Sequence, residues 1–198
     1  MLHKKSMVII FEKLLDGAKK YHDEFNTTDG IIGDGDLGIT ILNGIEEINK
    51  DISNFNDDLS NNFMLCSQSF VKKSGSSFGT LIAFAFMEIS KTLKGKTQCD
   101  HKDIINIMDT ALNTILNRGK TKLGDKTIAD TLSLILLRLQ NSKKNINYVE
   151  IFKTETEQAL EKFKGKKILI GRARMFGEKT KNLNDPGMFA LAKLTKNL

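Results

Sequence analysis

Phe78 to Leu93, which read FGTLIAFAFMEISKTL, form the most apolar stretch of this 198-residue chain. Apolar side chains recur there at the spacing of one helix face, at Phe78, Leu81, Ile82, Ala85, Phe86, Ile89 and Leu93. The longest unbroken apolar run, Leu81 to Met87, is far shorter than the roughly 20 residues that a membrane-spanning helix needs. We therefore predict that this stretch is the most buried helix of the fold and that the chain has no membrane span.

Seven other stretches show the same helical spacing, within residues 11–25, 41–52, 59–70, 104–115, 128–139, 148–163 and 188–194. The only proline is Pro186, so long helices can run uninterrupted almost everywhere else. Residues 167–170 alone look strand-like, and they are too short to build a sheet. The sequence predicts an all-α fold in which eight helices run up and down, each antiparallel to the next, in a single domain, residues 1–198.

The charge balance is 30 basic against 24 acidic residues, a net charge of +6 that favours anionic ligands or an acidic protein partner. The basic residues are spread over the helices without interleaved aromatic residues, which argues against nucleic acid as a partner. Cys66 and Cys99 have no metal-binding spacing, and the N-terminus becomes charged at Glu12 before a signal-peptide core can form. We expect a reduced, cytoplasmic protein.

The links between the predicted helices fall into two chemical classes. Three are ordinary solvated connections, at 53–58, 94–102 and 141–147. The other four are rich in Gly, Asp, Ser, Thr and Arg, at 29–38, 72–80, 118–127 and 165–187. Because alternate links of an up-and-down bundle lie at the same end, these four links should meet and form one site.

The first of these links carries Asp29, Asp34 and Asp36 among four glycines. Carboxylate oxygens suit hard cations such as Mg²⁺, and the glycines let the backbone turn three carboxylates toward one point. An EF-hand is excluded, because counting from Asp34 places Ile45 where the twelfth-position Glu is required. The alternative interpretation is an Asp-capped turn before the second helix.

The remaining links suggest a phosphate site. Residues 74–77, Ser-Gly-Ser-Ser, have the composition of an anion-binding helix N-terminus, although Ser-Gly links are also common. Asp125 could cap the sixth helix and place Lys126 near a phosphate, or form a plain N-cap. Arg172 and Arg174 suit charge that develops in phosphoryl transfer, or are simply solvated. Carboxylates, small residues and an arginine together are sufficient for phosphoryl transfer.

Four motifs occur in a familiar order: Ile32-Gly33-Asp34-Gly35-Asp36-Leu37-Gly38; Ser74-Gly75 with Phe78-Gly79-Thr80; Arg118-Gly119-Lys120 with Gly124-Asp125-Lys126-Thr127; and Gly171-Arg172-Ala173 with Gly177-Glu178 and Asp185-Pro186-Gly187. Over nearly its whole length, the chain resembles the L, ADP-binding subunit of dihydroxyacetone kinase (the DhaL, or DAK L-domain, family). The resemblance implies an eight-helix closed barrel with a nucleotide at one rim.

The resemblance also assigns residues to the site. It implies that Asp29, Asp34 and Asp36 hold two Mg²⁺ ions on the nucleotide phosphates and that Arg172 is catalytic. It further implies that ADP or ATP contacts Leu37, Gly38, Thr40, Lys73, Ser74, Gly75, Gly119, Thr127, Ile128, Arg172, Asp185, Pro186 and Gly187.

The activity that the resemblance implies is a phosphotransferase with an alcohol group as acceptor. In the family, resident Mg-ADP accepts a phosphoryl group from a phosphohistidine protein of the sugar phosphotransferase system. The group then passes to dihydroxyacetone held on a separate K subunit. A chain of 198 residues leaves no room for a K domain, which fits the stand-alone subunit.

Two alternatives stay open: an ATP-using kinase subunit for a related small substrate, and a regulatory paralogue of weakened activity. A related domain opens fatty acid kinases, but its chains are much longer.

Several positions depart from the family pattern. Leu37 stands where His is usual, Thr40 where Asn is usual, and Leu123 where Pro is usual. Residues 71–73, Val-Lys-Lys, replace a Gly-Gly-Ala stretch, which motivates the regulatory alternative. Our hypothesis is that Lys72 or Lys73 adds a phosphate contact. The acceptor, the donor, the oligomeric state (monomer or homodimer) and a lipid in the barrel interior are left open.

Overall fold

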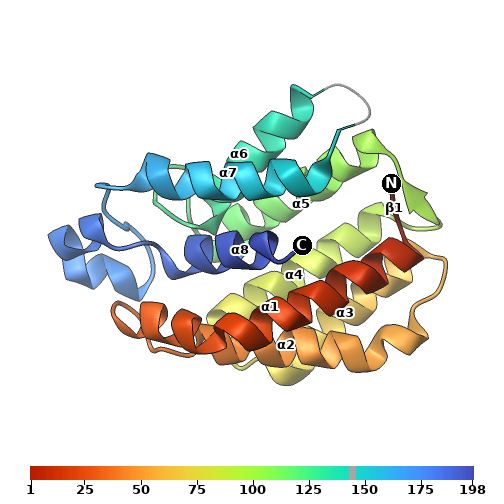
Figure 1. Cartoon of the computed structure of the whole chain (residues 1–198), viewed down its shortest axis with the longest axis horizontal. Coiled ribbons are helices and arrows are strands. Elements are labelled where there is room, and N and C mark those ends of the chain that lie inside the picture. Colours follow the sequence, from red (N-terminus) through yellow and green to blue (C-terminus); the bar gives the residue numbers. More distant parts are fainter. Residues whose placement is uncertain (143–145) are drawn as a thin grey trace.

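Helices dominate the computed structural model, which describes residues 1–142 and 146–198 (Figure 1). The helices are α1 (Lys4–Gly30), α2 (Leu37–Asp51), α3 (Leu59–Lys73), α4 (Ser77–Thr92), α5 (His101–Gly119), α6 (Ile128–Gln140), α7 (Tyr148–Phe163) and α8 (Pro186–Lys196). Each predicted helical stripe coincides with one of them, and only Ile52 and Leu93 fall one residue past a helix end, so the all-α prediction is confirmed. The middle of the expected solvated link 141–147 lies outside the described residues.

Polar side chains fix where most helices begin. The residue just before the helix accepts a hydrogen bond from a first-turn backbone N–H at Asp58, Ser76, Asp100, Thr127, Asn147 and Asp185. Such caps satisfy donors that the helix itself cannot, and Pro186 follows its cap at the first position of α8, where a missing N–H costs nothing. The helix ends therefore follow from local chemistry.

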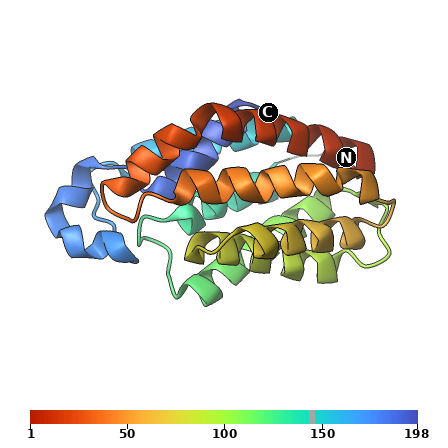
Figure 2. The same cartoon turned by 90° about the horizontal axis from the view of Figure 1, so that it is seen from below.

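Neighbouring helices pack in chain order. Each of α1 to α7 contacts the next helix, and α8 also contacts α1. The connections alternate between the two ends, so the links α1–α2, α3–α4, α5–α6 and α7–α8 lie at the end away from the N-terminus (Figures 1 and 2). This confirms the prediction that the four glycine-rich links share one end, which we call the rim.

The short strands were not predicted. β1 (Leu2–His3) pairs antiparallel with β2 (Gln98–Cys99) at the end opposite the rim. Two residues are too few to show a period in the sequence. The expected strand-like segment 167–170 has no strand assignment, and Leu169 N instead donates to the carbonyl of Asp125 (3.0 Å).

Short 3-10 helices occupy two of the links. η1 (Ile52–Asn54) follows α2, and η2 (Arg172–Asn182) lies within the long link between α7 and α8. η2 is interrupted at Gly177, whose φ of +52° a side chain would strain. The longest link is therefore a folded segment, although it carries no long apolar stripe.

Two apolar clusters form most of the core. The larger is built mainly from α1 to α4, and its centre includes Phe25, Ile48 and Leu59. The other joins α5, α6 and α7 around Ile135 and Leu139. Both clusters come from the helix faces that the spacing identifies as inward.

The prediction that residues 78–93 form the most buried helix is wrong. Few of the large side chains of α4 are buried, whereas more than half of the residues of α6 are buried. The reason is that Leu81 and Phe84 of α4 line a cleft at the rim instead of packing into the core. No helix among the described residues has the length and hydropathy to cross a membrane.

Candidate functional site

A cleft of about 870 Å³ opens at the rim between the four glycine-rich links. Twelve of the residues assigned by resemblance line it: Asp29, Asp34, Asp36, Leu37, Gly75, Gly119, Thr127, Ile128, Arg172, Asp185, Pro186 and Gly187. They come from stretches up to about 150 residues apart in the chain, and the helix topology brings them together. The volume is within the range typical of small-molecule sites.

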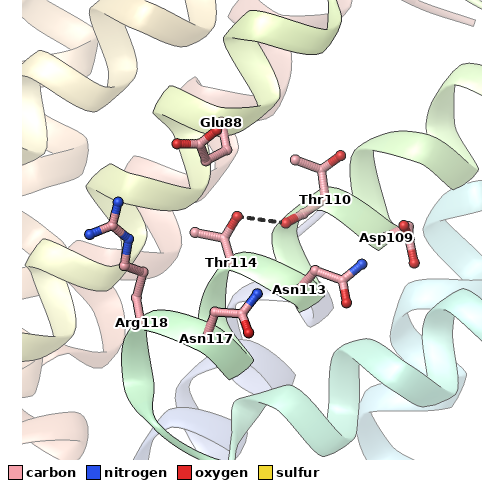
Figure 3. A pocket seen from close by; sticks show the side chains of 7 residues that line it. All are labelled: Glu88, Asp109, Thr110, Asn113, Thr114, Asn117 and Arg118. Atoms are coloured by element: carbon pink, nitrogen blue, oxygen red, sulfur yellow. Dashed lines mark hydrogen bonds between the residues drawn. The ribbon is translucent and has the colours of Figure 1, made fainter.

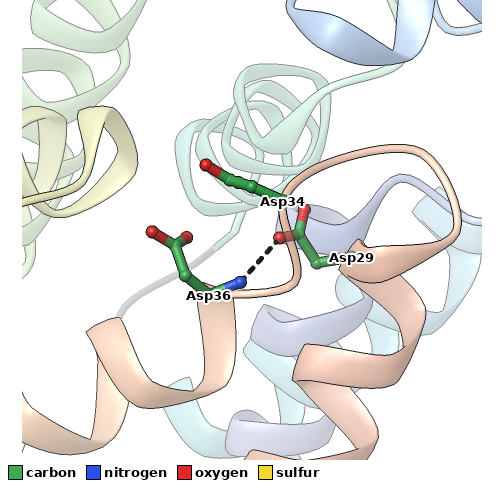
Figure 4. A group of neighbouring side chains, drawn as sticks. All are labelled: Asp29, Asp34 and Asp36. Atoms are coloured by element: carbon green, nitrogen blue, oxygen red, sulfur yellow. Dashed lines mark hydrogen bonds between the residues drawn. The ribbon is translucent and has the colours of Figure 1, made fainter.

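The acidic cluster lies in the α1–α2 link (Figure 4). Each of Asp29, Asp34 and Asp36 offers a carboxylate oxygen, and the three oxygens lie within 4.8 Å of one another. Backbone hydrogen bonds hold the loop: Asp29 Oδ2 accepts from the N–H groups of Gly35 (2.8 Å) and Asp36 (3.2 Å). Gly35 has φ +75°, a conformation that glycine adopts without strain. The loop thus brings three carboxylates together, as the sequence predicts.

Three carboxylates lie close together in this cluster, and Arg172 pairs with one of them, Asp34. Burial and the neighbouring carboxylates of Asp34 and Asp29 raise the pKa of Asp36, while Arg172 acts in the opposite direction. A divalent cation would relieve this repulsion, and three carboxylates are the hard oxygen ligands that Mg²⁺ prefers. The residues present therefore fit a magnesium site.

Arg172 meets the acidic cluster from the α7–α8 link. Its Nη1 lies 2.7 Å from Oδ2 of Asp34, and its side chain is 62% exposed at the mouth of the cleft. Gly171, with φ +66°, sets the turn that starts η2 and directs Arg172 inward. Arg174, two residues on, is exposed and does not line the cleft. The two arginines of the sequence pattern are therefore not equivalent.

The N-terminus of α4 forms another wall. Gly75, Ser76 and Ser77 line the cleft, and Ser76 caps the helix by accepting from Gly79 N (3.1 Å). Thr40 Oγ1 donates to Ser76 Oγ (2.9 Å), and Ser74 Oγ lies 3.4 Å from the same atom. Thr40 and Ser74 thus lie behind the wall and hold Ser76, rather than lining the cleft as the resemblance implied.

Gly38 is also one layer removed from the cleft. Its N–H donates to Asn26 Oδ1 (2.6 Å), and a Cβ there would lie only 1.9 Å from the carbonyl oxygen of His22. Glycine is needed at this position because α1 and α2 approach closely. We conclude that Gly38 supports the α1–α2 link from behind.

Lys72 and Lys73 point elsewhere. Both pair with Glu47, a buried carboxylate of α2, Lys72 by a hydrogen bond and Lys73 at 4.0 Å. Neither lysine lines the cleft. The geometry gives no support to our hypothesis that they contact a phosphate, and Lys73 is placed apart from the other assigned nucleotide residues.

The α5–α6 link differs from the sequence interpretation. Thr127 caps α6, while Asp125 binds within the link by accepting from Thr121 Oγ1 (3.0 Å) and Lys122 N (2.9 Å). Lys126 is 2% exposed and does not line the cleft, so the geometry gives no support to the interpretation that places it near a phosphate. Its φ is positive, at +63°, and its Nζ donates to the carbonyls of Lys166 (2.8 Å) and Leu183 (2.7 Å) inside the protein.

Sequence reasoning missed the apolar wall of the cleft. Leu81 and Phe84 of α4, Ile115 of α5 and Ile170 line it, together with Phe78. Phe78, Leu81 and Ile115 have the helical spacing of ordinary core residues, so the sequence holds no signal that separates these three from the core. Arg118, Lys120 and Thr121 also line the cleft, and the Arg118 guanidinium lies over the Phe84 ring, 4.3 Å from its centre.

A smaller pocket of about 340 Å³ lies between α4 and α5 (Figure 3). Polar side chains line it, among them Glu88, Asp109 and Asn113, and Thr114 Oγ1 donates to the carbonyl of Thr110 (2.7 Å). In the described part of the chain, only the Asp29, Asp34 and Asp36 cluster has metal-binding geometry. The rim cleft is therefore the candidate site.

Proteins of known name are similar to this chain in sequence. The chain is 31% identical to the ADP-binding subunit DhaL of PEP-dependent dihydroxyacetone kinase 1 from Listeria innocua, over 84% of this chain and 80% of the relative. It is 30% identical to the ADP-binding subunit DhaL of the PTS-dependent dihydroxyacetone kinase from Lactococcus lactis, over 95% of this chain and 91% of the relative.

The fold has a solved counterpart. The dihydroxyacetone kinase of C. freundii superposes with a TM-score of 0.75 at 21% identity, over 96% of this chain. This chain spans 33% of that kinase, so the likeness concerns the fold of one part of it. The family model of the DAK2 domain matches residues 31–198, which include the acidic cluster except Asp29. The chain therefore belongs to the DAK2 domain family.

Proposed function

We propose that this protein is the ADP-binding L subunit of a dihydroxyacetone kinase, a phosphotransferase that works with a separate K subunit. The observation that carries the proposal is the rim cleft, where three carboxylates and Arg172 face one another beside the capped N-terminus of α4. The relatives from Listeria innocua and Lactococcus lactis bear this subunit's name and are matched over most of their length. We treat residues 1–198 as one nucleotide-binding domain.

In this proposal the two halves of the cleft bind different parts of Mg-ADP. Asp29, Asp34 and Asp36 would hold the magnesium ions, two by family resemblance, since their oxygens already converge. The apolar wall around Phe84 and Ile128 suits the face of a purine base. When bound, Mg-ADP supplies the diphosphate that takes up and passes on a phosphoryl group.

The chain's own residues supply positioning and charge. Phosphoryl transfer is mostly a matter of position and of stabilising negative charge on the transferred group. Arg172 is the candidate catalytic residue, because its guanidinium is fixed at the acidic cluster yet open to solvent. Gly75, Ser76 and Ser77 offer backbone N–H groups at a helix N-terminus, where the helix dipole favours phosphate oxygens.

Access to the cleft supports transfer between proteins. The side chains of Arg172 and Asp34 are 62% and 46% exposed, so a partner can reach the reacting groups from outside. We propose a phosphohistidine protein of the phosphotransferase system as donor and dihydroxyacetone on the K subunit as acceptor. These reactions would take place in the cytoplasm.

Reconstitution with partners tests the proposal. The protein is mixed with the K subunit of the Lactococcus lactis system, dihydroxyacetone and Mg²⁺, and dihydroxyacetone phosphate is measured with either the phosphoenolpyruvate-driven donor chain or ATP. We expect product with the donor chain and none after EDTA treatment. Product with ATP alone would identify an ATP-using kinase subunit instead. A complex with the K subunit that forms no product from either donor would favour the regulatory paralogue.

A further inference from the structure

Lys126 is a buried cation whose partners are backbone carbonyls. Its side chain is 2% exposed, and Nζ donates to the carbonyl oxygens of Leu183 (2.7 Å), Lys166 (2.8 Å) and Thr180 (3.2 Å). Burying an ammonium is costly, and a φ of +63° is unfavourable for a lysine. The buried ammonium and the positive φ of Lys126 both cost free energy, which indicates that its position serves something beyond local structure.

The carbonyls that Lys126 binds belong to both ends of one segment. Lys166 precedes the 3-10 helix η2, whereas Thr180 and Leu183 lie at its end, so the ammonium ties the segment 165–183 into a closed loop. The neighbouring carbonyl of Asp125 accepts from Leu169 N (3.0 Å) in the same segment. Hydrogen bonds from the α5–α6 link therefore hold segment 165–183 in place.

The other side of segment 165–183 packs against the α1–α2 link. Ile168 and Ala173 are buried against Ile32, with Leu183 packed at the edge of this small cluster. Ile32 lies between Asp29 and Asp34 in the α1–α2 link. Arg172 adjoins this contact and reaches Asp34 at 2.7 Å. A continuous set of contacts thus leads from Lys126 to the acidic cluster, although Lys126 itself does not line the cleft.

We propose that Lys126 is a positioning residue, which closes segment 165–183 and thereby sets Arg172 against Asp34 at the rim of the cleft. The catalytic consequence rests on the proposed function, whereas the effect on the segment does not. Small displacements of a charged group at a reacting centre are costly, since a shift of ~1 Å can lower a rate by about 100-fold.

The variant Lys126→Met tests the proposal, because it keeps an extended side chain and removes the ammonium. We expect kcat to fall by about tenfold to 100-fold. Lys126→Arg retains donors for the carbonyls and should recover most of that loss. The matched control is Lys122→Met, an exposed lysine in the same link, which should leave kcat unchanged.

A double-mutant cycle asks whether Lys126 acts through Arg172. If it does, Lys126→Met lowers kcat strongly in the wild type but changes it by less than about twofold when Arg172→Ala is already present. An equal fold-loss in both backgrounds would overturn the proposal. Unchanged kcat in a folded Lys126→Met protein would also overturn it.

Amide hydrogen exchange provides a readout that needs no nucleotide or partner. In Lys126→Met, the amides of Ile168 and Leu169 should exchange faster than in the wild type, because their acceptors lie in the network that Lys126 holds. The amides of α4 serve as the internal reference. Unchanged exchange over 165–183 would contradict the positioning role. If the wild-type protein shows no transferase activity, faster exchange in Lys126→Met would still support the positioning role, and only the proposed function would be refuted.

If Lys126→Met does not fold, Thr180→Val tests the same network. It removes the hydroxyl that accepts from Ile168 N (3.0 Å) and donates to the carbonyl of Gly177 (2.7 Å), and it keeps the side-chain shape. We expect faster exchange of the Ile168 amide and a lower kcat that again depends on Arg172. A folded Thr180→Val protein with normal exchange and kcat would overturn the proposal.

Discussion

Asp36 combines burial with two neighbouring carboxylates, which together raise its pKa, and it contacts no first-turn N–H of α2. Its charge therefore costs the apo protein energy and does not support the helix. We predict that Asp36→Asn abolishes the Mg²⁺ dependence of ADP affinity and leaves helix content unchanged. Calorimetric titration of ADP with and without Mg²⁺, together with circular dichroism, measures both effects.

Asp109→Asn is the matched control, because Asp109 is an exposed carboxylate of α5 outside the acidic cluster. It should retain the Mg²⁺ dependence of the wild type. Magnesium-dependent ADP binding of wild-type strength in Asp36→Asn would remove Asp36 from the metal site.

Both cysteines are inert thiols in this structure. Cys66 and Cys99 are fully buried, and burial raises the pKa of both, that of Cys99 to about 11. Because the thiolate is the reactive form, we predict that a disulfide reagent at pH 8 labels neither cysteine in the native protein and both after unfolding in guanidinium. Rapid native labelling would show that one of the two sites opens readily.

At the scale of elements, His101 joins three helices at the end opposite the rim. From the start of α5, its Nδ1 lies 3.0 Å from Tyr148 Oη of α7, and Nε2 lies 3.1 Å from the carbonyl of Leu139 in α6. We predict that His101→Ala lowers the free energy of unfolding by ~1–3 kcal/mol, because it leaves partly buried polar groups without a partner. Urea denaturation measures this loss.

His22→Ala provides the comparison, since the ring nitrogens of His22 contact the carbonyl of Lys19 and the carboxylate of Asp23, both within its own helix. This substitution should change the free energy of unfolding by less than ~0.5 kcal/mol. Equal losses in the two variants would mean that the contacts of His101 do not tie the helices together.

The helices themselves were predictable because local features encode them. The stripe from Ile128 to Leu139 specifies α6 before any partner is known, although its cap is Thr127 and not the expected Asp125. The segment η2 was not predictable, because long-range bonds such as Lys126 Nζ to the Leu183 carbonyl hold it. A glycine-rich link with many charges has no periodic signal from which such bonds could be inferred.

At the scale of the whole molecule, the site follows from alternation of the links. Up-and-down helices place every second link at one end, so Asp34 and Arg172 meet although 138 positions separate them. The apolar wall could not be predicted in the same way. Leu81 and Ile115 have the spacing of core residues, and periodicity shows that a face points inward without showing whether a neighbour or a ligand meets it.

Side-chain direction limited the rest of the prediction. Lys73 ends α3 and pairs with the buried Glu47 of α2 away from the cleft, and Lys126 reaches inward to the carbonyls of Lys166 and Leu183. Thr40 and Ser74 contribute by holding Ser76. The motifs and the resemblance associated all four with the rim links, but only the direction of each side chain distinguishes the cleft lining from its support.

The central claim is that the rim cleft holds Mg-ADP, and the nucleotide content of the purified protein tests it most directly. The protein is acid-quenched without added ligand, and the supernatant is quantified by ion-exchange chromatography, before and after treatment with EDTA. We predict close to one ADP per chain, lost after EDTA treatment, because the acidic cluster can hold the phosphates only through a cation. A protein that contains no nucleotide, and that binds neither Mg-ADP nor Mg-ATP when these are added, would contradict the account.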